Sequence, residues 1–447
     1  MLRESTKPPH DGSDVNLEPS LLKRGRDRMM AALRIANSKL ANLCAPLVAI
    51  AQIGSKSRVH HHRGQEFLAT GKPDEAEAEF RIAMQYRTNR IAAVRGLLQA
   101  LKDQGRIEQV VPELLKMAER MSEDEIRQLP FPAHCVSQVA HDESLRLDLD
   151  RLVTNNPRAF DATVLLALVE AKRENVDGSI RLFRNLAIHH YGKLHHPDAA
   201  PAEPRFLILG QPKAATTTLF HSLTHHPRMT GPLLKEPNYW SSEYALGPNW
   251  YQSLFPHWTE ESWRFTGEAS TSYLLHPEAP ARVAKSLPKV KLIVSLRNPV
   301  SRAYSEYWMQ RGFGNLGLSF EEFANKLMKR REFCPFNRVK TNKNGLPNNL
   351  FVGSVVLPGL RNWLDFFPPE QLLVVRDEAV KRDLQAVVRQ ICRFLEVPTF
   401  ELPASIHMNV GHYPPMPEDL KRRLEAWYAP HEEALKAFLA THPNKIL

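Results

Sequence analysis

The sequence predicts an α/β domain with a central parallel sheet, preceded by an all-helical domain. Three apolar runs carry the first prediction, because a run without polar alternation is typical of a strand buried on both faces of a parallel sheet. The runs are RFLILG (205–210), KLIVSLR (291–297) and QLLVVRDE (371–378), and helical patterns lie between them. Upstream, residues 21–190 are helical in pattern and strand signals are scarce. The 447 residues are enough for two or three such domains.

The chain divides into four expected segments. Residues 1–20 are polar, contain three prolines and are expected to form a disordered tail. Residues 21–190 are expected to form the helical domain. Residues 191–204 are rich in proline and small residues and are expected to be a linker. Residues 205–447 are expected to form the α/β domain, with helices layered on both faces of the sheet.

The helical region contains a repeat. Gly71 and Gly105 are 34 residues apart, which is the period of the tetratricopeptide repeat. Each glycine is expected to end one helix. A degenerate third unit at 165–188 has Asn175 in place of the glycine, and asparagine also accepts a left-handed helix cap. We expect either a platform for a protein partner or long substrate, or an array that only packs on the next domain.

Composition narrows the class of protein. Hydrophobic residues make up 43% of the chain and charged residues 24%, as in ordinary globular proteins. No run reaches the roughly 18 apolar residues of a membrane span. The longest, at 40–53, is expected to be a buried helix, with peripheral membrane contact as the alternative. The four cysteines are far apart and form no CxxC pair, which favours a reducing cytoplasm.

The net charge of +10 favours anionic partners such as nucleotides, nucleic acids, acidic glycans or anionic membranes. Nucleic acid is not expected, because the charge forms no aromatic-interleaved patch apart from the short run KLMKRREF at 326–333. The histidines cluster at 60–62, 189–190 and 195–196, but none forms a helical i, i+4 pair with a carboxylate nearby. We therefore expect no metal site.

The loop after the first strand is the expected centre of the chemistry. FLILGQPKAATTTLFHSL, residues 206–223, has the pattern of a strand, a turn and the start of a helix. Ligands bind at the carboxyl ends of strands in open parallel sheets, and amides at a helix N-terminus point at an anion. Lys213 adds a charge, and the three threonines at 216–218 add hydroxyl donors.

This loop is not the GxxxxGK[ST] loop of kinases. Counting from Gly210, the motif requires glycine at 215 and lysine at 216, where the sequence has Ala215 and Thr216. The lysine comes three residues early, and the next strand ends in Arg297 rather than in a metal-binding aspartate. Ala215 serves without strain if its φ is negative, whereas a positive φ costs about 1 kcal/mol.

A second motif, LIVSLRNPVSRAYSEYW at 292–308, has the pattern of a strand, an Asn-Pro turn and a helix. Arg297 ends the strand, and Ser305 lies on the helix eight residues later. Both side chains can converge on one phosphate, the arginine through a bidentate contact and the serine through its hydroxyl. The alternative is that Arg297 forms a surface ion pair and Ser305 is an ordinary helix residue.

The two motifs together resemble the sulfotransferase superfamily. KAATT (213–217) and RNPVSRAYSEY (297–307), about 80 residues apart, match its two cofactor-binding motifs. KEPNYWSSEY (235–244) and GEASTSYL (267–274) resemble the heparan sulfate N- and O-sulfotransferases and their bacterial relatives. The resemblance covers roughly 204–440, and bacterial members with N-terminal tetratricopeptide repeats look most similar. It implies a P-loop-like, three-layer sulfotransferase fold.

The resemblance also implies an activity. It is the transfer of a sulfuryl group from 3′-phosphoadenosine 5′-phosphosulfate (PAPS) to a hydroxyl or amine of a carbohydrate, in a cell-surface polysaccharide or glycolipid, without a metal. Lys213 matches the catalytic lysine of the family, the loop matches its 5′-phosphosulfate site, and Arg297 with Ser305 matches its 3′-phosphate site. The implied cofactor-binding residues are Gly210, Lys213, Ala214, Ala215, Thr216, Thr217, Thr218, Arg297 and Ser305.

Two glutamates are candidates for the general base that accepts the proton of the acceptor. Glu236 in KEPNYW is the first candidate and Glu268 in GEAS the second. The chain departs from the family at Ala215, at Ala269, where some heparan sulfate enzymes have lysine, and at 407–416, which contains Gly411 but no Lys or Arg. These departures keep open an alternative, a tetratricopeptide adaptor with a catalytically silent sulfotransferase-like domain.

Overall fold

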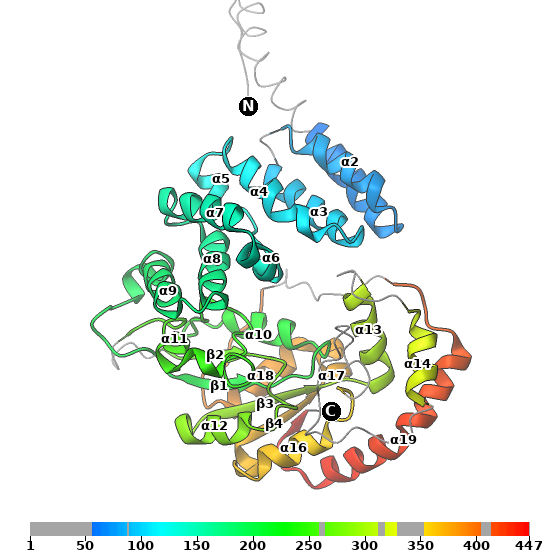
Figure 1. The fold of residues 1–447 in the computed structure, drawn as a ribbon. Helices are drawn as coiled ribbons and strands as arrows, with labels where there is room; N and C mark the ends of the chain where they lie inside the picture. Colours follow the sequence, from blue (N-terminus) through cyan, green and yellow to red (C-terminus); the bar gives the residue numbers. More distant parts are fainter. Residues whose placement is uncertain are drawn as a thin grey trace, which may run out of the picture.

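The structure is a computed structural model, and it describes residues 56–86, 89–258, 264–311, 318–328, 353–403 and 413–446. The predicted tail at 1–20, the apolar run at 40–53 and Gly411 lie outside the described residues, as does most of the basic run at 326–333. Figure 1 shows two parts, a helical array at the N-terminal side and an α/β part that contains the sheet.

Short antiparallel helices build the first part. Gly71 and Gly105 have φ of 72° and 74° and follow helices directly, which is the left-handed C-cap that glycine adopts without steric cost. In chain order, the elements are residues 56–69, α2 (Pro73–Ala83), α3 (Arg90–Asp103), η1 (Ile107–Gln109), α4 (Val110–Ala118), α5 (Glu123–Arg127), η2 (Ala133–Cys135), α6 (Val136–His141), α7 (Glu143–Asn155), α8 (Phe160–Lys172), α9 (Val176–Tyr191) and η3 (Gly192–Leu194).

The third unit of the repeat departs from the prediction. Asn175 was expected in the left-handed conformation, but that conformation belongs to Glu174, with φ of 64°, and Asn175 has φ of −86°. Asn175 instead caps α9, because its side-chain oxygen accepts a hydrogen bond of 3.1 Å from the Gly178 N–H. An asparagine at the N-cap position provides a hydrogen-bond acceptor for one of the free N–H groups in the first turn of α9. Glu174 precedes the N-cap position and does not take this role.

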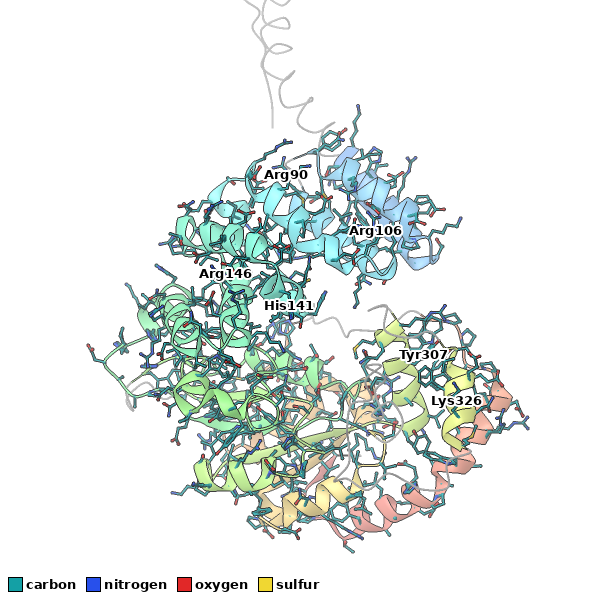
Figure 2. All side chains as sticks on the ribbon, viewed as in Figure 1. Arg90, Arg106, His141, Arg146, Tyr307 and Lys326 are labelled. Atoms are coloured by element: carbon teal, nitrogen blue, oxygen red, sulfur yellow. The ribbon has the colours of Figure 1, made fainter. Side chains whose placement is uncertain are left out.

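Ion pairs join neighbouring helices of this part, on top of a shared apolar core that runs from α2 to α8. Arg90 on α3 lies 3.0 Å from Glu125 on α5, and Arg146 on α7 lies 3.1 Å from Glu170 on α8. These arginines are labelled in Figure 2. The pairs are partly buried and therefore weakly screened, so they help to fix the register of one helix on the next.

The sheet has five parallel strands in the order β2-β1-β3-β4-β5. The three predicted strands are β1, β3 and β4, and the predicted α/β fold with a preceding helical region is confirmed. β2 and β5 are additional. Gly267 allows β2 to lie against β1, because a Cβ there would fall 2.3 Å from the Phe206 ring. The strands are β1 (Pro204–Ile208), β2 (Thr266–Ala269), β3 (Lys291–Leu296), β4 (Leu372–Arg376) and β5 (Lys445–Ile446).

Alternate residues of each central strand face opposite layers. In β1, Leu207 packs in one apolar cluster and Phe206 and Ile208 in another, and β3 and β4 alternate in the same way. The first cluster includes residues of α9, α11, α12, α16 and α19, and the second includes residues of α10, α17 and α18. The sheet is therefore the middle of three layers.

The helices and turns of this part are α10 (Thr216–Thr224), η4 (Tyr244–Leu246), α11 (Pro248–Gln252), α12 (Ala279–Ser286), α13 (Pro299–Arg311), α14 (Phe320–Met328), α16 (Leu357–Leu364), η7 (Pro369–Gln371), α17 (Asp377–Arg382), α18 (Leu384–Phe394) and α19 (Glu418–Thr441). Within the described part of the chain, no helix is both long and apolar enough to cross a membrane.

The helix α9 contacts both parts of the molecule. It packs along α8, and its residues Phe183 and Leu186 lie in the same apolar cluster as Trp250 on α11. The Trp250 indole N–H donates to the Ser179 hydroxyl at 3.0 Å. The predicted linker follows α9, and its Ala202 N–H donates to the Pro256 carbonyl at 2.8 Å. The segment boundaries predicted around 191–204 stay predictions, but this part of the chain is tied to the α/β layers.

Candidate active site

The loop after β1 begins with a glycine that no other residue can replace without strain. Gly210 has φ of 121°, and a Cβ there would lie 2.8 Å from the Thr271 carbonyl oxygen. The loop then pairs with the end of β3, because the Gln211 N–H donates to the Ser295 carbonyl at 2.7 Å and the Ser295 N–H donates to the Gly210 carbonyl at 2.8 Å. These bonds hold the loop at the carboxyl edge of β1 and β3.

Two residues of the loop other than glycine are left-handed. Lys213 has φ of 65° and Ala215 has φ of 62°. Ala215 is the N-cap residue of α10, and its methyl group makes no capping hydrogen bond. The sequence left open whether Ala215 stands in this loop without strain. Its positive φ answers that it does not, because an alanine in this region is strained by about 1 kcal/mol.

The start of α10 leaves a set of N–H groups free. Among the described residues, the backbone N–H groups of Lys213 and of residues 215–218 have no hydrogen-bond acceptor. Thr216 and Thr218 are buried, Thr217 is exposed, and Ala214 is fully buried. The Ala214 carbonyl is occupied by the Ser295 hydroxyl. Free amides at a helix N-terminus, with threonine hydroxyls beside them, form an anion site.

The ammonium group of Lys213 lies beside α13. Its Nζ is 3.7 Å from the Met309 sulfur, and no carboxylate of the described residues is within ion-pair distance of it. Burial lowers the pKa of Lys213, and the charge of Arg297 lowers it further. The lysine is therefore a partly desolvated group that forms no ion pair with a carboxylate in the described part of the chain, although the charge of Glu306 raises its pKa in part.

Arg297 leaves the end of β3 and reaches the loop. Its Nη1 donates to the Lys213 carbonyl at 3.0 Å, and its backbone N–H donates to the Gln211 side-chain oxygen at 3.2 Å. Its Nε lies 3.4 Å from a carboxylate oxygen of Asp377, which is buried and also lies 2.7 Å from the Lys381 Nζ. Arg297 is thus in an ion pair, as the alternative interpretation expected, but the pair is partly buried and the guanidinium also bonds the loop.

The second predicted phosphate ligand is not joined to the first. Ser305 is buried in α13, and among the described residues it makes no hydrogen bond to Arg297 or to the loop. Arg302, one turn before it, is fully buried, pairs with Glu306 and donates from Nε to the Ser354 hydroxyl at 2.6 Å. The structure therefore brings Lys213 and Arg297 together and leaves Ser305 as a neighbour on the adjoining helix.

The two candidate bases differ in exposure. Glu236 has a side chain that is 35% exposed, and it pairs with the adjacent Lys235. Glu268 on β2 is 0% exposed and accepts hydrogen bonds from three hydroxyl groups. The pKa of Glu268 is raised to about 7, because burial and, to a smaller degree, the charge of Glu236 raise it more than the three hydrogen bonds lower it. Ala269, next to it, is 1% exposed and offers no charge to an acceptor.

Several polar residues of this site were not found from the sequence. Gln211 is buried and bridges the loop to the Gly353 carbonyl at 2.9 Å, and Asp377 holds Arg297. Asp377 follows β4 directly, so the rule that sites form at the carboxyl ends of parallel strands was the available signal. Gln211 had no such signal. Within the described residues, no group of three or more His, Cys, Asp or Glu side chains could hold a metal.

Comparisons with known proteins agree on one part of the chain. Residues 203–413 match a family model described as a sulfotransferase domain. The bifunctional heparan sulfate N-deacetylase/N-sulfotransferase 2 of Bos taurus is 30% identical over 203 residues, which are 44% of this chain and 22% of that protein. The membrane-associated sulfotransferase kil1 of Dictyostelium discoideum is 25% identical over 302 residues, which are 52% of this chain and 64% of that protein.

Among solved structures, a sulfotransferase from Alicyclobacillus acidocaldarius is 28% identical, with a TM-score of 0.44, and the match covers 54% of this chain and 96% of that one. The chain spans less than a quarter of the length of the bovine relative and under two thirds of the Dictyostelium one.

Proposed function

Residues 203–413 form a domain of the sulfotransferase family, and on this premise we propose that the protein transfers the sulfuryl group of PAPS to a hydroxyl or amine of a carbohydrate. One observation carries the proposal. The N–H groups of Lys213 and of residues 215–218 have no acceptor among the described residues, and the same loop carries the Lys213 ammonium group and is bonded by the Arg297 guanidinium. This donor set suits an anion with several oxygens.

The residues fit a bisphosphate donor. The Nη1 of Arg297 donates to the Lys213 carbonyl of the loop, and its Nε faces the Asp377 carboxylate. Its Nη2 makes no hydrogen bond within the described part of the chain. Nη2 is therefore available for a phosphate oxygen, in an orientation that the other two nitrogens fix. Thr216 and Thr218 add hydroxyl donors close to the free amides. We propose Ser305 as a further 3′-phosphate ligand, supported by its motif and its burial beside Arg302.

PAPS, when bound, supplies the sulfuryl group. In this proposal Lys213 stabilises the negative charge that develops on the departing phosphate oxygen, because a cation fixed at that point lowers the energy of the transition state. Glu236 accepts the proton of the attacking group, since it is the more exposed of the two candidate glutamates. Lys235 beside it offers a positive charge to an acidic acceptor.

The proposed acceptor is a glycan or glycolipid of the cell surface. The names of the relatives, which include heparan sulfate sulfotransferases, and the net charge of +10 support an acidic carbohydrate. We further propose a cytoplasmic protein, whose helical repeats serve as a platform for a protein partner or a long acceptor. Peripheral contact with a membrane is compatible with this proposal.

One observation favours a second function, that of an adaptor with a silent sulfotransferase-like domain. Ala215 stands in the left-handed region, where the loop is strained until something compensates. In that case the protein binds the nucleotide but transfers nothing.

The test combines binding with transfer. Calorimetry with adenosine 3′,5′-bisphosphate is expected to give micromolar affinity, and ³⁵S-labelled PAPS is expected to label a glycan from an extract of the host. Lys213→Ala is expected to lower the rate of transfer by about 100-fold or more and the affinity by less than tenfold. The control is Lys289→Ala, an exposed lysine that precedes β3 at the opposite edge of the sheet.

Each result separates the alternatives. Without micromolar binding of either nucleotide, the enzyme proposal is wrong. Binding without transfer to any acceptor in a broad glycan screen favours the adaptor. Dependence on ATP and magnesium would point to a kinase.

A further inference from the structure

Three hydroxyl groups surround the buried carboxylate of Glu268. The Tyr273 hydroxyl donates to Oε1 at 2.7 Å, the Tyr251 hydroxyl donates to the same oxygen at 3.1 Å, and the Ser270 hydroxyl donates to Oε2 at 2.8 Å. Glu268, Ser270 and Tyr273 are 0% exposed. A substrate therefore has no path to this carboxylate, and the carboxylate has another task.

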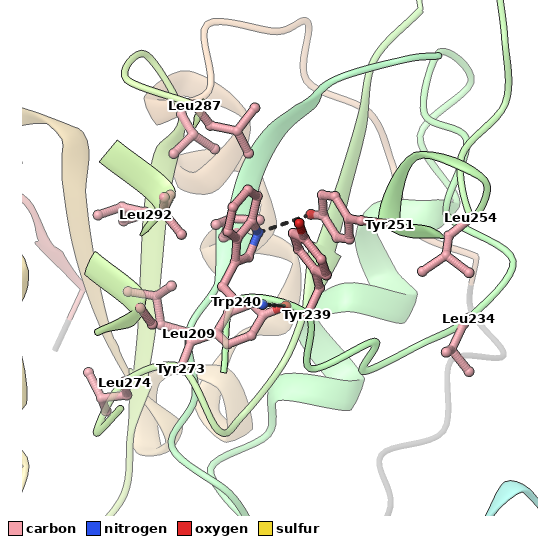
Figure 3. Packing of buried hydrophobic residues seen from close by; sticks show 14 of the residues in the cluster. Leu209, Leu234, Tyr239, Trp240, Tyr251, Leu254, Tyr273, Leu274, Leu287 and Leu292 are labelled. Atoms are coloured by element: carbon pink, nitrogen blue, oxygen red, sulfur yellow. Dashed lines mark hydrogen bonds between the residues drawn. The ribbon is translucent and has the colours of Figure 1, made fainter. Parts of the chain in front are cut away.

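The same three hydroxyls accept hydrogen bonds from one short segment. The Ser270 oxygen accepts from the Asn238 N–H at 3.1 Å, and the Tyr273 oxygen accepts from the Trp240 N–H at 3.4 Å. The Tyr251 oxygen accepts from the Trp240 indole N–H at 3.3 Å. Figure 3 shows both contacts of Trp240. Every hydroxyl thus donates to the carboxylate and accepts from the segment that follows Glu236.

The direction of these bonds depends on the charge of the carboxylate. A hydroxyl has one proton and two lone pairs, whereas an ionised carboxylate only accepts. Because all three protons point at Glu268, all three oxygens turn a lone pair toward the segment. The carboxylate therefore determines how the hydroxyls are oriented, and the hydroxyls determine where the backbone at 238–240 lies.

The segment needs this support. Glu236 and Asn238 have φ of 58° and 53°, and neither is a glycine. A backbone with two such residues persists only where its surroundings over-determine it. The Asn238 side chain adds a bond of 2.9 Å to the Glu236 carbonyl, so the position of one residue fixes the other.

We propose that Glu268 is a positioning residue that holds the segment 236–240, and through it the carboxylate of Glu236, by way of the hydroxyls of Ser270, Tyr251 and Tyr273. The proposal rests on the proposed function insofar as Glu236 is the base. It assigns Glu268 a role distinct from the general base that its motif suggested.

Glu268→Gln tests the inference at one atom. The amide nitrogen of glutamine donates and cannot accept, so at least one hydroxyl loses its acceptor while the shape of the side chain is kept. We expect transfer to slow by about 10- to 100-fold, with the affinity for adenosine 3′,5′-bisphosphate changed by less than twofold. Tyr244→Phe is the matched control, because Tyr244 lies outside the segment, packs against Tyr239, and its hydroxyl makes no hydrogen bond within the described residues.

A double-mutant cycle distinguishes positioning from general damage. If Glu268 acts through Glu236, then Glu268→Gln slows transfer in the native background and has little further effect in a Glu236→Gln background. Equal losses in both backgrounds would overturn the proposal. If Glu268→Gln does not fold, then Ser270→Ala and Tyr273→Phe take its place, each removing one bridging hydroxyl, with an expected slowing of about three- to tenfold.

Amide hydrogen exchange provides a readout that does not need the reaction. Protection of the Asn238 and Trp240 amides is expected to fall by tenfold or more in Glu268→Gln. In the native protein, the same protection is expected to fall as the pH drops through about 7, where Glu268 takes up a proton. The titratable groups that face Glu268 are Tyr251, Tyr273 and Glu236, and burial keeps both phenols protonated by raising their pKa.

The two proposals fail in different ways. If the native protein binds no donor, the proposed function is wrong, and exchange at Asn238 and Trp240 still tests the role of Glu268. If the native protein transfers sulfate but Glu268→Gln leaves both the rate and the exchange unchanged, the positioning role is wrong and the proposed function stands.

Discussion

The loop after β1 and the segment at 236–240 each place two residues other than glycine in the left-handed region: Lys213 and Ala215 in the first, Glu236 and Asn238 in the second. The first is held mainly by its carbonyl oxygens, since Arg297 and the Ser295 hydroxyl occupy those of residues 213 and 214. The segment at 236–240 is held by the N–H groups of Asn238 and Trp240, which donate to the hydroxyls of Ser270 and Tyr273. The same backbone conformation thus leaves donors free in one loop and uses them in the other.

This difference teaches where each loop obtains its stability. The loop after β1 keeps five N–H groups without an acceptor among the described residues, so an anion that binds there completes it. In the segment at 236–240, the N–H groups of Asn238 and Trp240 already have acceptors within the protein, so we expect it to present Glu236 in one orientation before any ligand arrives. Strain is offset by a ligand in the first loop and by the protein in the second.

The largest expected effect concerns the cost of keeping the Glu268 carboxylate ionised inside the fold, a cost to the whole fold that is separate from the orientation of the three hydroxyls. The pKa of Glu268 rises from 4.5 to about 7 on folding, so its contribution to the free energy of unfolding is present below pH 4.5 and is lost as the pH rises through about 7. Each pKa unit corresponds to about 1.4 kcal/mol, so the loss is about 3 kcal/mol. Glu268→Gln does not titrate. We therefore expect the free energy of unfolding of Glu268→Gln, relative to that of the native protein, to rise by about this amount between pH 4.5 and 7. Urea unfolding at several pH values measures this difference.

A constant difference between the two proteins across that pH range would contradict this expectation. It would mean that Glu268 is ionised as easily in the fold as in the unfolded chain, and that the three hydrogen bonds fully offset burial.

The next effect concerns the anchor of the first loop. Arg297→Ala removes the bond to the Lys213 carbonyl as well as the proposed phosphate contact. The affinity for adenosine 3′,5′-bisphosphate is expected to fall by about 10- to 100-fold, or roughly 1.4 to 2.7 kcal/mol, because charge-assisted contacts are among the stronger ones. Calorimetry measures the loss. Arg205→Ala, an exposed arginine on β1, is the control, and an equal loss there would remove the special role of Arg297.

The smallest effect compares the strain of the two loops. Ala215→Gly is expected to stabilise the free protein by about 1 kcal/mol, because glycine adopts positive φ without the steric penalty, and to leave donor affinity unchanged or improved. Asn238→Gly removes similar strain but loses two side-chain hydrogen bonds, from the Ser272 hydroxyl at 2.7 Å and to the Glu236 carbonyl at 2.9 Å. It is expected to destabilise by about 1 kcal/mol.

Thermal unfolding measures both changes, with Ala214→Gly as the control that should only lose stability. If Ala215→Gly destabilises the protein or sharply weakens donor binding, the positive φ of Ala215 is not a source of strain in this loop.

The sequence predicted the three central strands because each is an unbroken apolar run. β2 was missed, since TGEA contains a glycine and a charged residue and looks like a loop until Phe206 packs over Gly267. Lys213 and Arg297 were identified because a motif places them at strand ends. The burial of Glu268 was not, because nothing in the sequence shows that the hydroxyls of Ser270 and Tyr273, two and five residues after it, and of Tyr251, 17 residues before it, turn toward its carboxylate.

The position of α9 has a consequence for any attempt to divide this protein. A truncated protein that began at residue 192 would keep all five strands and lose α9, one of the helices on that face of the sheet. The Trp250 indole N–H would then lose its acceptor, the Ser179 hydroxyl, and the Trp250 ring would lose its contact with Phe183. We therefore expect the smallest stable fragment of the α/β part to begin at α9 rather than after it. The helix α9 therefore joins the helical array to one layer of the α/β part through side-chain packing as well as through the chain itself.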